Sequence, residues 1–174
     1  YSLGLSPAKP HVKSARVVGD TLARWHPHGD SSVYGAMVRL AQPWIMRYPL
    51  VDFHGNYGSV SGDGPAASRY TEVRFSKIAE AGITEGLKNK VVNFMPNYSE
   101  DEEEPITMPA LFPNLLCNPT SGIGVAIASS WLPHNLTEVI ASIKAYVENN
   151  SITTKELVDN YLHGPDFPLG GRII

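Results

Sequence analysis

The sequence predicts an α+β fold, and three patterns support that prediction. Apolar residues recur at helical spacing over residues 13–25 and again over residues 30–42, with a short turn between the two stretches. A strand-like stretch and a Gly-rich segment follow over residues 50–64, which is the composition expected of a β wing. Further short helical and strand-like stretches continue to the end of the chain. The order predicts a helix-turn-helix with an attached wing, followed by a smaller mixed region.

The first predicted helix begins near Lys13, with Ser14 as its N-cap, and ends at Trp25. The run His26-Pro27-His28-Gly29 ends it, because proline disfavours helix in the preceding residue and glycine permits a tight turn. The residues Asp30-Ser31-Ser32 are all suitable N-caps for the second helix, which Gln42-Pro43 ends. In a helix-turn-helix, the second helix enters the major groove and its first turn offers N–H groups to phosphate. A plain helical hairpin is the alternative.

The segment after the second helix combines one strand with many glycines. Leu50–Phe53 has strand character, and the surroundings of Val60 could form a returning strand. The glycines do not make a nucleotide-binding loop, because neither a Gly-Lys-Ser/Thr ending nor the dinucleotide-binding spacing is present. A helical pattern is expected over Val73–Leu87, which would place Tyr70 at a loop-to-helix junction.

Tyr70 is the strongest candidate for a reactive residue. A phenol with a pKa of about 10 is a poor nucleophile near neutral pH. The neighbouring Arg69 would favour the phenolate, and a nearby base could accept the proton. These properties suit reversible attack on a phosphodiester, with DNA held as a phosphotyrosine ester. Alternatively, Tyr70 is a half-buried tyrosine that caps a helix.

The acidic run Glu100–Glu104 is expected to be a solvated loop and a natural boundary, although a metal or basic-partner site is the alternative. Val91–Phe94 before it is typical of a strand. Beyond it, Ser121–Ala128 is small and apolar, as in a closely packed strand or turn. Gly171–Ile174 is expected to begin a further strand.

Two helices near the end of the chain have capping-box signatures. Asn135 with Glu138, and Thr153 with Glu156, each precede apolar residues at helical spacing.

The overall composition is that of a globular chain. It has 174 residues, is 43% hydrophobic and carries a net charge of −3. The charge is unevenly distributed along the chain. Residues 1–77 contain nine Lys and Arg and five acidic residues, whereas residues 78–174 contain five Lys and Arg and twelve acidic residues. A basic half and an acidic half suggest that one face meets a polyanion. The single Cys117 excludes a disulfide framework and fits a reducing cytoplasm. No membrane span or signal peptide is visible.

Several motifs together resemble one family. They are Lys13–Asp20, His26–Ser31, Arg69–Glu72, Phe112–Leu116, Ser121–Ile123, Pro133–Leu136 and Gly164–Pro168. In order and spacing they are similar to the A subunit of bacterial type IIA topoisomerases, the gyrase A and topoisomerase IV A family. The likeness covers essentially the whole chain, which is therefore expected to be a fragment of a longer protein that is inactive alone.

The resemblance implies a fold and a set of site residues. The fold would be a winged-helix DNA-cleavage domain over residues 1–104, followed by the start of a mixed α/β tower domain over residues 105–174. Tyr70 would be the nucleophile, Arg69 would stabilise the phosphate in the transition state, and His28 would transfer the proton or contact the phosphate. A turn histidine that caps a helix, or a metal site with His26, are the alternatives for His28. The DNA-binding residues would be Lys13, Arg16, His26, Ser31, Ser32, Arg39 and Ile123.

Ile123 matches a family isoleucine that inserts between base pairs and bends DNA; an ordinary buried isoleucine is the alternative. Ser31 and Gly35 occupy the positions where quinolone drugs engage. Gly35 and Ser68 depart from the family pattern. The family often has an acidic residue at the position of Gly35 and usually has a methionine at the position of Ser68. Weaker quinolone action is therefore expected.

The resemblance also implies partners and cofactors. The partners would be double-stranded DNA, the B subunit, and a second copy of the A subunit. The B subunit would hold most of the Mg²⁺ ligands and would bind ATP. A further active-site arginine is expected upstream of Tyr1, and dimerisation coils downstream of Ile174. Two other functions are open: a non-catalytic winged-helix regulator, and a paralogue that binds DNA without cutting it.

Overall fold

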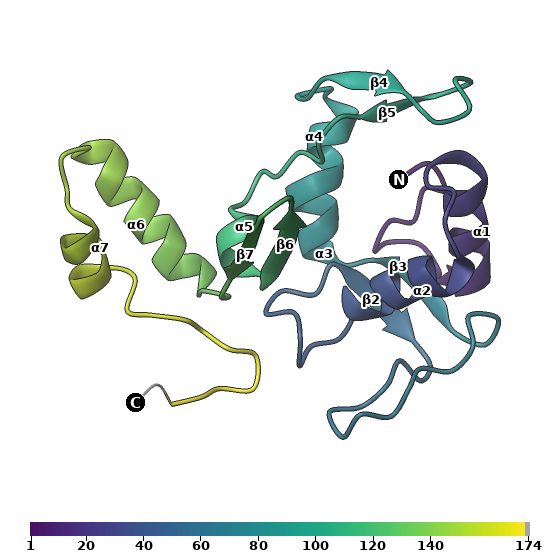
Figure 1. The fold of residues 1–174 in the computed structure, drawn as a ribbon, viewed down its shortest axis with the longest axis horizontal. Helices are drawn as coiled ribbons and strands as arrows, with labels where there is room; N and C mark the ends of the chain where they lie inside the picture. Colours follow the sequence, from purple (N-terminus) through teal and green to yellow (C-terminus); the bar gives the residue numbers. More distant parts are fainter. Residues whose placement is uncertain (173–174) are drawn as a thin grey trace. The chain divides into compact units, whose positions relative to one another are not determined.

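The computed structural model describes residues 1–172 and has a mixed α+β fold of helices and small antiparallel sheets (Figure 1). The chain forms two compact units, each described here by itself. The first contains residues 1–42 and 49–112, and the second contains Pro43–Tyr48 and the chain from Pro113 onward. Within residues 1–172, no helix combines the length and apolar character needed to cross a membrane.

Two helices open the first unit and pack against each other, as the apolar periodicity predicts. They are α1 (Ser14–Arg24) and α2 (Asp30–Arg39). Their N-caps differ from the prediction: Lys13 and Gly29 occupy the cap positions, and neither makes a side-chain capping bond. Ser14 is instead fully buried inside the first turn of α1.

A three-stranded antiparallel sheet lies beside these helices, in the order β1-β3-β2. The strands are β1 (Val12–Lys13), β2 (Val51–His54) and β3 (Glu72–Phe75). In the register, Val73 pairs with both Val12 and Phe53. The predicted helix over Val73–Leu87 is therefore wrong at its start. The stretch Glu72–Phe75 alternates polar and apolar residues, which is the period of a strand, and sheet pairing decides its conformation.

The connection between β2 and β3 spans residues 55–71 and contains no strand, so the predicted return near Val60 is wrong. Val60 is 63% exposed, and the return occurs at Glu72. The Ser59 amide donates to the Asp63 carbonyl at 3.3 Å, and this bond closes a local turn instead of a ladder.

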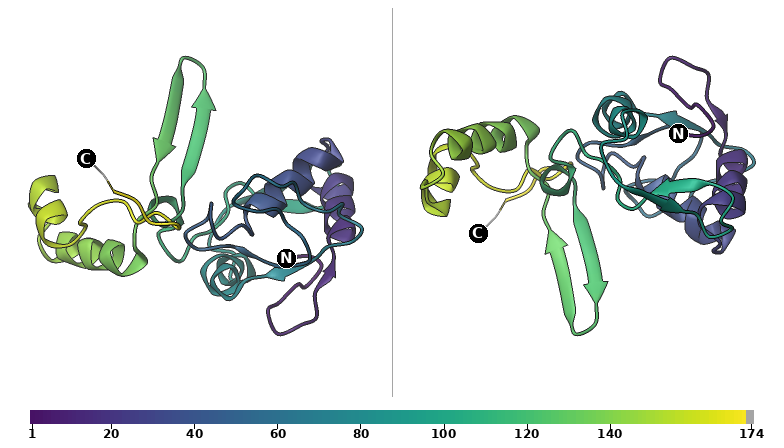
Figure 2. Two further views of the ribbon diagram at one scale, coloured as in Figure 1. Left: turned by 90° about the horizontal axis from the view of Figure 1, so that it is seen from below. Right: turned by 90° about the horizontal axis from the view of Figure 1, so that it is seen from above.

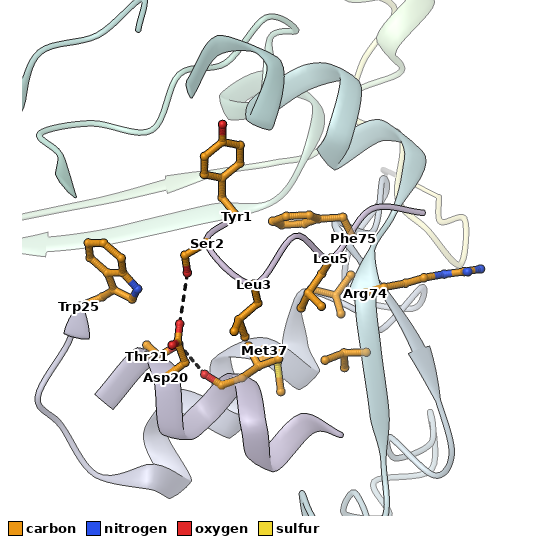
Figure 3. A pocket seen from close by; sticks show the side chains of 13 residues that line it. Tyr1, Ser2, Leu3, Leu5, Asp20, Thr21, Trp25, Met37, Arg74 and Phe75 are labelled. Carbon is orange, nitrogen blue, oxygen red and sulfur yellow. Dashed lines mark hydrogen bonds between the residues drawn. The ribbon is translucent and has the colours of Figure 1, made fainter. Parts of the chain in front are cut away.

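The N-terminal segment covers the apolar side of α1 and the sheet (Figure 3). The Phe75 amide donates to the Leu5 carbonyl at 3.0 Å, which attaches this segment to the end of β3. A cavity of about 190 Å³ remains beneath it, between Leu3, Val17 and Met37. Val73, only 2% exposed, reaches this core from the sheet.

A continuous helical stretch follows β3. It comprises α3 (Lys77–Ala79), a π-helical turn η1 (Glu80–Thr84) and α4 (Glu85–Lys88), with Ser76 as the N-cap. A Cβ at Gly82 would lie 2.3 Å from the Phe112 ring, and a Cβ at Gly86 would lie 2.6 Å from Pro109. Glycine is required at both positions because the segment before Phe112 packs directly on the helix backbone.

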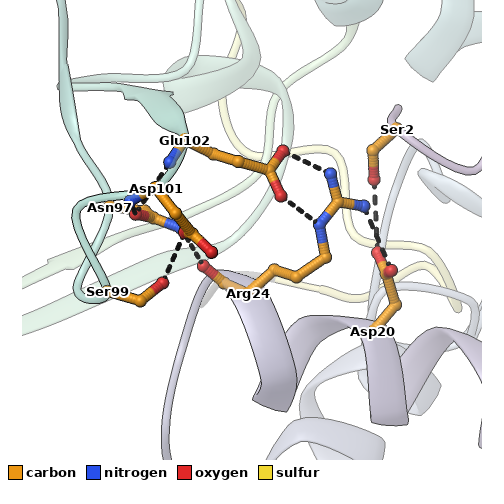
Figure 4. Close-up of polar contacts among 7 residues, drawn as sticks. All are labelled: Ser2, Asp20, Arg24, Asn97, Ser99, Asp101 and Glu102. Atoms are coloured by element: carbon orange, nitrogen blue, oxygen red, sulfur yellow. Dashed lines mark hydrogen bonds and ion pairs between the residues drawn. The ribbon is translucent and has the colours of Figure 1, made fainter.

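A hairpin of β4 (Phe94–Pro96) and β5 (Glu103–Pro105) holds the carboxyl end of α1 (Figure 4). The strand predicted over Val91–Phe94 thus begins three residues later. Arg24 forms a two-pronged ion pair with Glu102, with Nε 2.6 Å from Oε1. The Asn97 side chain donates to the Arg24 carbonyl at 2.8 Å. The acidic run is therefore not simply a solvated loop.

The second unit contains α5 (Asn114–Cys117), β6 (Thr120–Gly124), β7 (Ile127–Trp131), α6 (Leu136–Glu148) and α7 (Thr154–Asn160). Both helices predicted from capping signals are confirmed. Asn135 accepts from two amides of α6, and Thr153 with Glu156 forms a full capping box on α7. Gly171 and Arg172 are not in a strand, and the rest of that predicted strand lies outside the described residues.

The β6–β7 hairpin is a thin two-stranded ribbon (Figure 2). All residues from Thr120 to Trp131 are exposed, so the prediction that Ser121–Ala128 is closely packed is wrong. Small, apolar composition does not distinguish a packed strand from one that is available to bind a partner.

Candidate functional site

Tyr70 lies at the end of a tight turn over residues 67–70, here called the Tyr70 turn. The Tyr70 amide donates to the Ala67 carbonyl at 2.9 Å, and β3 begins two residues later. The junction is therefore loop to strand, and the predicted loop-to-helix junction is wrong. The Tyr70 side chain is 64% exposed, which excludes the half-buried helix cap. The Arg69 guanidinium carbon lies 4.6 Å from the centre of the Tyr70 ring, so a positive charge accompanies the phenol.

The amino end of α1 holds the Tyr70 turn through the backbone. The Ser14 amide donates to the Thr71 carbonyl at 2.9 Å, and the Ala15 amide donates to the Ser68 carbonyl at 3.1 Å. The first N–H groups of a helix have no acceptor within the helix, so they are free to make such bonds. The turn is thus joined to α1 on both sides of Tyr70.

Three hydroxyl groups form a second connection beneath the turn. The hydroxyl oxygens of Thr71 and Ser14 lie 2.8 Å apart, and those of Tyr34 and Thr71 lie 2.9 Å apart. The Tyr34 hydroxyl also donates to the Ala66 carbonyl at 2.6 Å. Ser14 and Thr71 are fully buried. We call Ser14, Thr71 and Tyr34 the hydroxyl chain.

Sequence reasoning missed the hydroxyl chain. The position of Ser14 before an apolar helical pattern fits an N-cap equally well. Tyr34 lies four residues after Asp30, and its position as the one aromatic residue of α2 was the available signal. Only the fold brings residues so distant in sequence within hydrogen-bonding distance.

Charged side chains lie on the sheet beside the turn. Lys13 Nζ is 2.9 Å from Glu72 Oε1, and this hydrogen bond lowers the pKa of Glu72. Arg74 Nε is 2.7 Å from Asp52 Oδ2, and His11 Nε2 is 3.3 Å from the same oxygen. Burial acts to raise the pKa of Asp52, but the bonds from Arg74 and His11 outweigh it and lower the pKa. These pairs favour the ionised form of both carboxylates on the sheet.

His26 and His28 lie exposed in the turn between α1 and α2. Their ring centres are 3.8 Å apart in an edge-to-face arrangement, and His28 Nδ1 lies 2.9 Å from the Pro27 carbonyl. Across residues 1–172, no hydrogen bond or ring contact joins His28 to Tyr70. The same part of the chain contains no group of three or more His, Cys, Asp or Glu side chains placed to hold a metal ion.

The remaining predicted DNA-binding side chains of the first unit are exposed. Lys13 and Arg16 lie at the amino end of α1, Ser31 and Ser32 lie in the first turn of α2, and Arg39 lies in its last turn. Gly35 is exposed in the middle of α2, and a Cβ there would meet no atom within 4 Å.

Ile123 extends from β6 in the second unit, 94% exposed, so it is not an ordinary buried isoleucine. It pairs with Ala128 across the ribbon, while Val125 at the tip is 99% exposed. The tip thus presents bare apolar side chains to its surroundings.

Comparisons with known proteins identify the family of this chain. Residues 1–174 match the family model that describes the A subunit of DNA gyrase/topoisomerase IV. The chain is 52% identical over 172 residues to the DNA gyrase A subunit of Streptococcus pneumoniae serotype 4, covering 99% of this chain and 21% of that protein. It is 51% identical over 173 residues to the DNA gyrase A subunit of Ureaplasma parvum serovar 3, covering 99% of this chain and 20% of that protein. The chain thus spans about a fifth of the length of these relatives, and it belongs to the family of DNA gyrase and topoisomerase IV A subunits.

Proposed function

We propose that this chain is the DNA-cleaving part of a type IIA topoisomerase A subunit, with a winged-helix domain over residues 1–104 and the start of a tower domain over residues 105–174. The observation that carries the proposal is the exposed Tyr70 beside Arg69, on a turn held from beneath by two helices. An exposed side chain on a rigidly held backbone suits a nucleophile that must meet a large substrate.

The chemistry is a reversible transesterification. The Tyr70 oxygen attacks a DNA phosphorus atom, forming a 5′-phosphotyrosine bond while the bond to the 3′ oxygen breaks. The phenol proton leaves to a base, and the departing 3′ oxygen gains a proton; religation reverses both steps. Arg69 stabilises the added charge on the phosphate in the transition state. His28 is the proposed proton carrier or phosphate contact, because its side chain is exposed and an imidazole can both accept and donate a proton.

Double-stranded DNA is the proposed substrate, and the exposed cations and hydroxyls of α1 and α2 are its proposed contacts. These contacts are Lys13, Arg16, His26, Ser31, Ser32 and Arg39. Ile123 is the proposed wedge between base pairs, which its 94% exposure permits.

The working enzyme is proposed to be a cytoplasmic assembly of two A subunits and two B subunits. Mg²⁺ is proposed to be held mainly by the B subunit, which is also proposed to bind ATP, as membership of the gyrase and topoisomerase IV A-subunit family implies. This segment alone is expected not to relax DNA.

The test uses the full-length protein with its B subunit, Mg²⁺ and supercoiled DNA. Denaturant trapping should yield DNA covalently linked to the A subunit, and Tyr70→Phe should abolish the link. Tyr146→Phe is the matched control, because Tyr146 is a comparably exposed tyrosine, 52% accessible, on α6. An adduct that persists in Tyr70→Phe would overturn the assignment and favour a non-catalytic winged-helix DNA binder.

Gly35 supports a proposal about quinolone drugs. Ser31 is retained on α2, but Gly35 offers no carboxylate to the drug-binding position, and the space around it is open. The Gly35→Asp variant should therefore form drug-stabilised cleavage complexes at lower quinolone concentration than the parent enzyme. Equal drug potency in the two proteins would contradict the proposal.

A further inference from the structure

The hydroxyl chain is unusual because polar groups are placed where apolar groups would pack without cost. A buried hydroxyl must be hydrogen-bonded to avoid a penalty of about 1–3 kcal/mol. Ser14 and Thr71 are fully buried, and valine or alanine at these positions would need no partner. The protein meets the requirement by linking three hydroxyls in series. The backbone groups that this series contacts indicate its role.

Tyr34 connects the two sides of the Tyr70 turn. Its oxygen lies 2.6 Å from the Ala66 carbonyl, just before the turn, and 2.9 Å from Thr71 Oγ1, just after it. One phenol on α2 therefore fixes the separation between the entry and exit of the turn. Ser14 fixes the exit a second time, through its hydroxyl and its amide.

Thr71 makes contacts on both sides in this series. Its hydroxyl donates to Ser14 Oγ at 2.8 Å and lies 2.9 Å from the Tyr34 hydroxyl, a contact in which either group can be the donor. The Ala66 carbonyl can only accept, so Tyr34 is the donor in that bond. Thr71 is thus the central member, and its removal breaks two bonds, whereas loss of the Ser14 hydroxyl breaks one.

From this geometry we infer that Tyr34 and Thr71 are positioning residues for the Tyr70 nucleophile, and that they couple its location to the placement of α2. The inference rests on the proposed function. Ser31 and Ser32, the proposed phosphate contacts, begin the same helix within one turn of Tyr34. When DNA binds at the start of α2, the Tyr70 oxygen would therefore already lie at a fixed distance from the scissile phosphate. Misplacing a reacting atom by about 1 Å can cost about 10²-fold in rate.

The experiment measures single-turnover DNA cleavage at saturating DNA, using the full-length A subunit assembled with Mg²⁺ and its B subunit. Thr71→Val removes the hydroxyl without changing the shape of the side chain, and Thr71→Ser restores the hydroxyl. We expect Tyr34→Phe and Thr71→Val to lower the cleavage rate about 10- to 100-fold, Ser14→Ala to lower it less, and Thr71→Ser to recover most of it. The DNA dissociation constant should stay within about twofold in all variants.

The controls separate positioning from folding and from the proposed function. Rates are compared well below the unfolding temperature of the least stable variant, and Tyr146→Phe should match the parent. Cleavage rates within twofold of the parent in Thr71→Val, or equal defects in Thr71→Val and Thr71→Ser, would overturn the inference alone. Absence of a Tyr70 adduct in the parent enzyme would overturn the proposed function and this inference with it.

Discussion

The Tyr70 turn and the β6–β7 hairpin both present an exposed side chain to solvent, but they are built in opposite ways. Tyr70 is 64% exposed and lies over fully buried residues, Thr71 and Ser14, which hold its backbone. Ile123 is 94% exposed on a ribbon in which every residue from Thr120 to Trp131 is exposed. Two helices and a sheet hold the backbone of the Tyr70 turn, whereas within residues 1–172 the described support of the hairpin is the ladder between β6 and β7.

The difference matches the precision that each proposed task needs. The oxygen of a nucleophile must lie within a fraction of an ångström of its reactive position. This precision requires supporting residues whose own conformations are fixed by packing and hydrogen bonds. A wedge between base pairs gains from apolar contact that is not directional, so a ribbon that adapts to its partner is sufficient. Of the two regions, the one with more hydrogen-bonded and buried support is thus the one where a bond is proposed to form.

The largest expected difference between the two regions is in hydrogen exchange. Amides of β3 should exchange only when the first unit unfolds. Their protection should therefore equal the free energy of unfolding of that unit, which is on the order of 5 kcal/mol or more. Amides of β6 and β7 should open locally and exchange at least about 100-fold faster than those of β3. Exchange measured by NMR or mass spectrometry would contradict the comparison if both regions were equally protected.

Substitution of a core valine should show the same contrast in stability. Val73→Ala in β3 should lower the free energy of unfolding by about 2 kcal/mol, because the side chain is 2% exposed and its removal leaves a cavity. Val125→Ala, at a position 99% exposed, should change it by less than about 0.5 kcal/mol. Urea denaturation measures both, and similar losses would show that the hairpin is more tightly supported than its exposure indicates.

Substitutions in the β6–β7 hairpin should instead affect DNA binding. Ile123→Asp should leave the unfolding transition unchanged but weaken DNA bending and lower DNA affinity about tenfold, since a carboxylate cannot replace apolar contact with bases and is repelled by phosphate. Fluorescence energy transfer across a bound duplex measures the bend. Ser130→Ala, on the neighbouring strand, is the control, and unchanged bending in Ile123→Asp would remove the proposed wedge.

The smallest effect should be a pH dependence confined to the first region. The pKa of Asp52 is lowered in the folded chain, so its contribution is present above the unfolded value of 3.8 and is lost as pH falls through the folded value. Asp52→Asn should therefore destabilise the protein by about 1 kcal/mol at pH 7, and by progressively less below about pH 4. Residues 120–131 contain no ionisable side chain. The hydrogen-exchange protection of β6 and β7, after correction for the pH dependence of intrinsic amide exchange, should therefore not change with pH as the stability of the first unit does.

Local signals in the sequence predict helices better than strands. The caps at Asn135 and Thr153 predict α6 and α7, and apolar spacing predicts α1 and α2, because these signals act within a few residues. The helix predicted from Val73 is wrong over β3, since a polar-apolar alternation of only four residues directly before a true helix is too short to outweigh the helical pattern that follows it. Pairing of β3 with β1 and β2, at residues 12–13 and 51–54, decides the conformation.

The candidate site divides in the same way. Motif order singles out Tyr70, Arg69 and Ile123, and the structure places all three side chains on the surface. Nothing in the sequence pattern connects Ser14, Tyr34 and Thr71, which are separated by 20 and 37 residues and meet only in the folded chain. Glu102 is likewise one member of an undifferentiated acidic run in the sequence, and only the fold pairs it with Arg24, 78 residues away.

The amino-acid sequence alone determined the family, the helices with strong caps and the residues with reactive side chains, because these depend on residue identity and short-range spacing. Only the tertiary structure decided that Tyr70 precedes a strand, that buried hydroxyls support it, and that the segment around Ile123 is bare. The physical reason is that hydrogen-bond partners and burial are properties of groups brought together across the chain, and a linear pattern does not contain the distances between them.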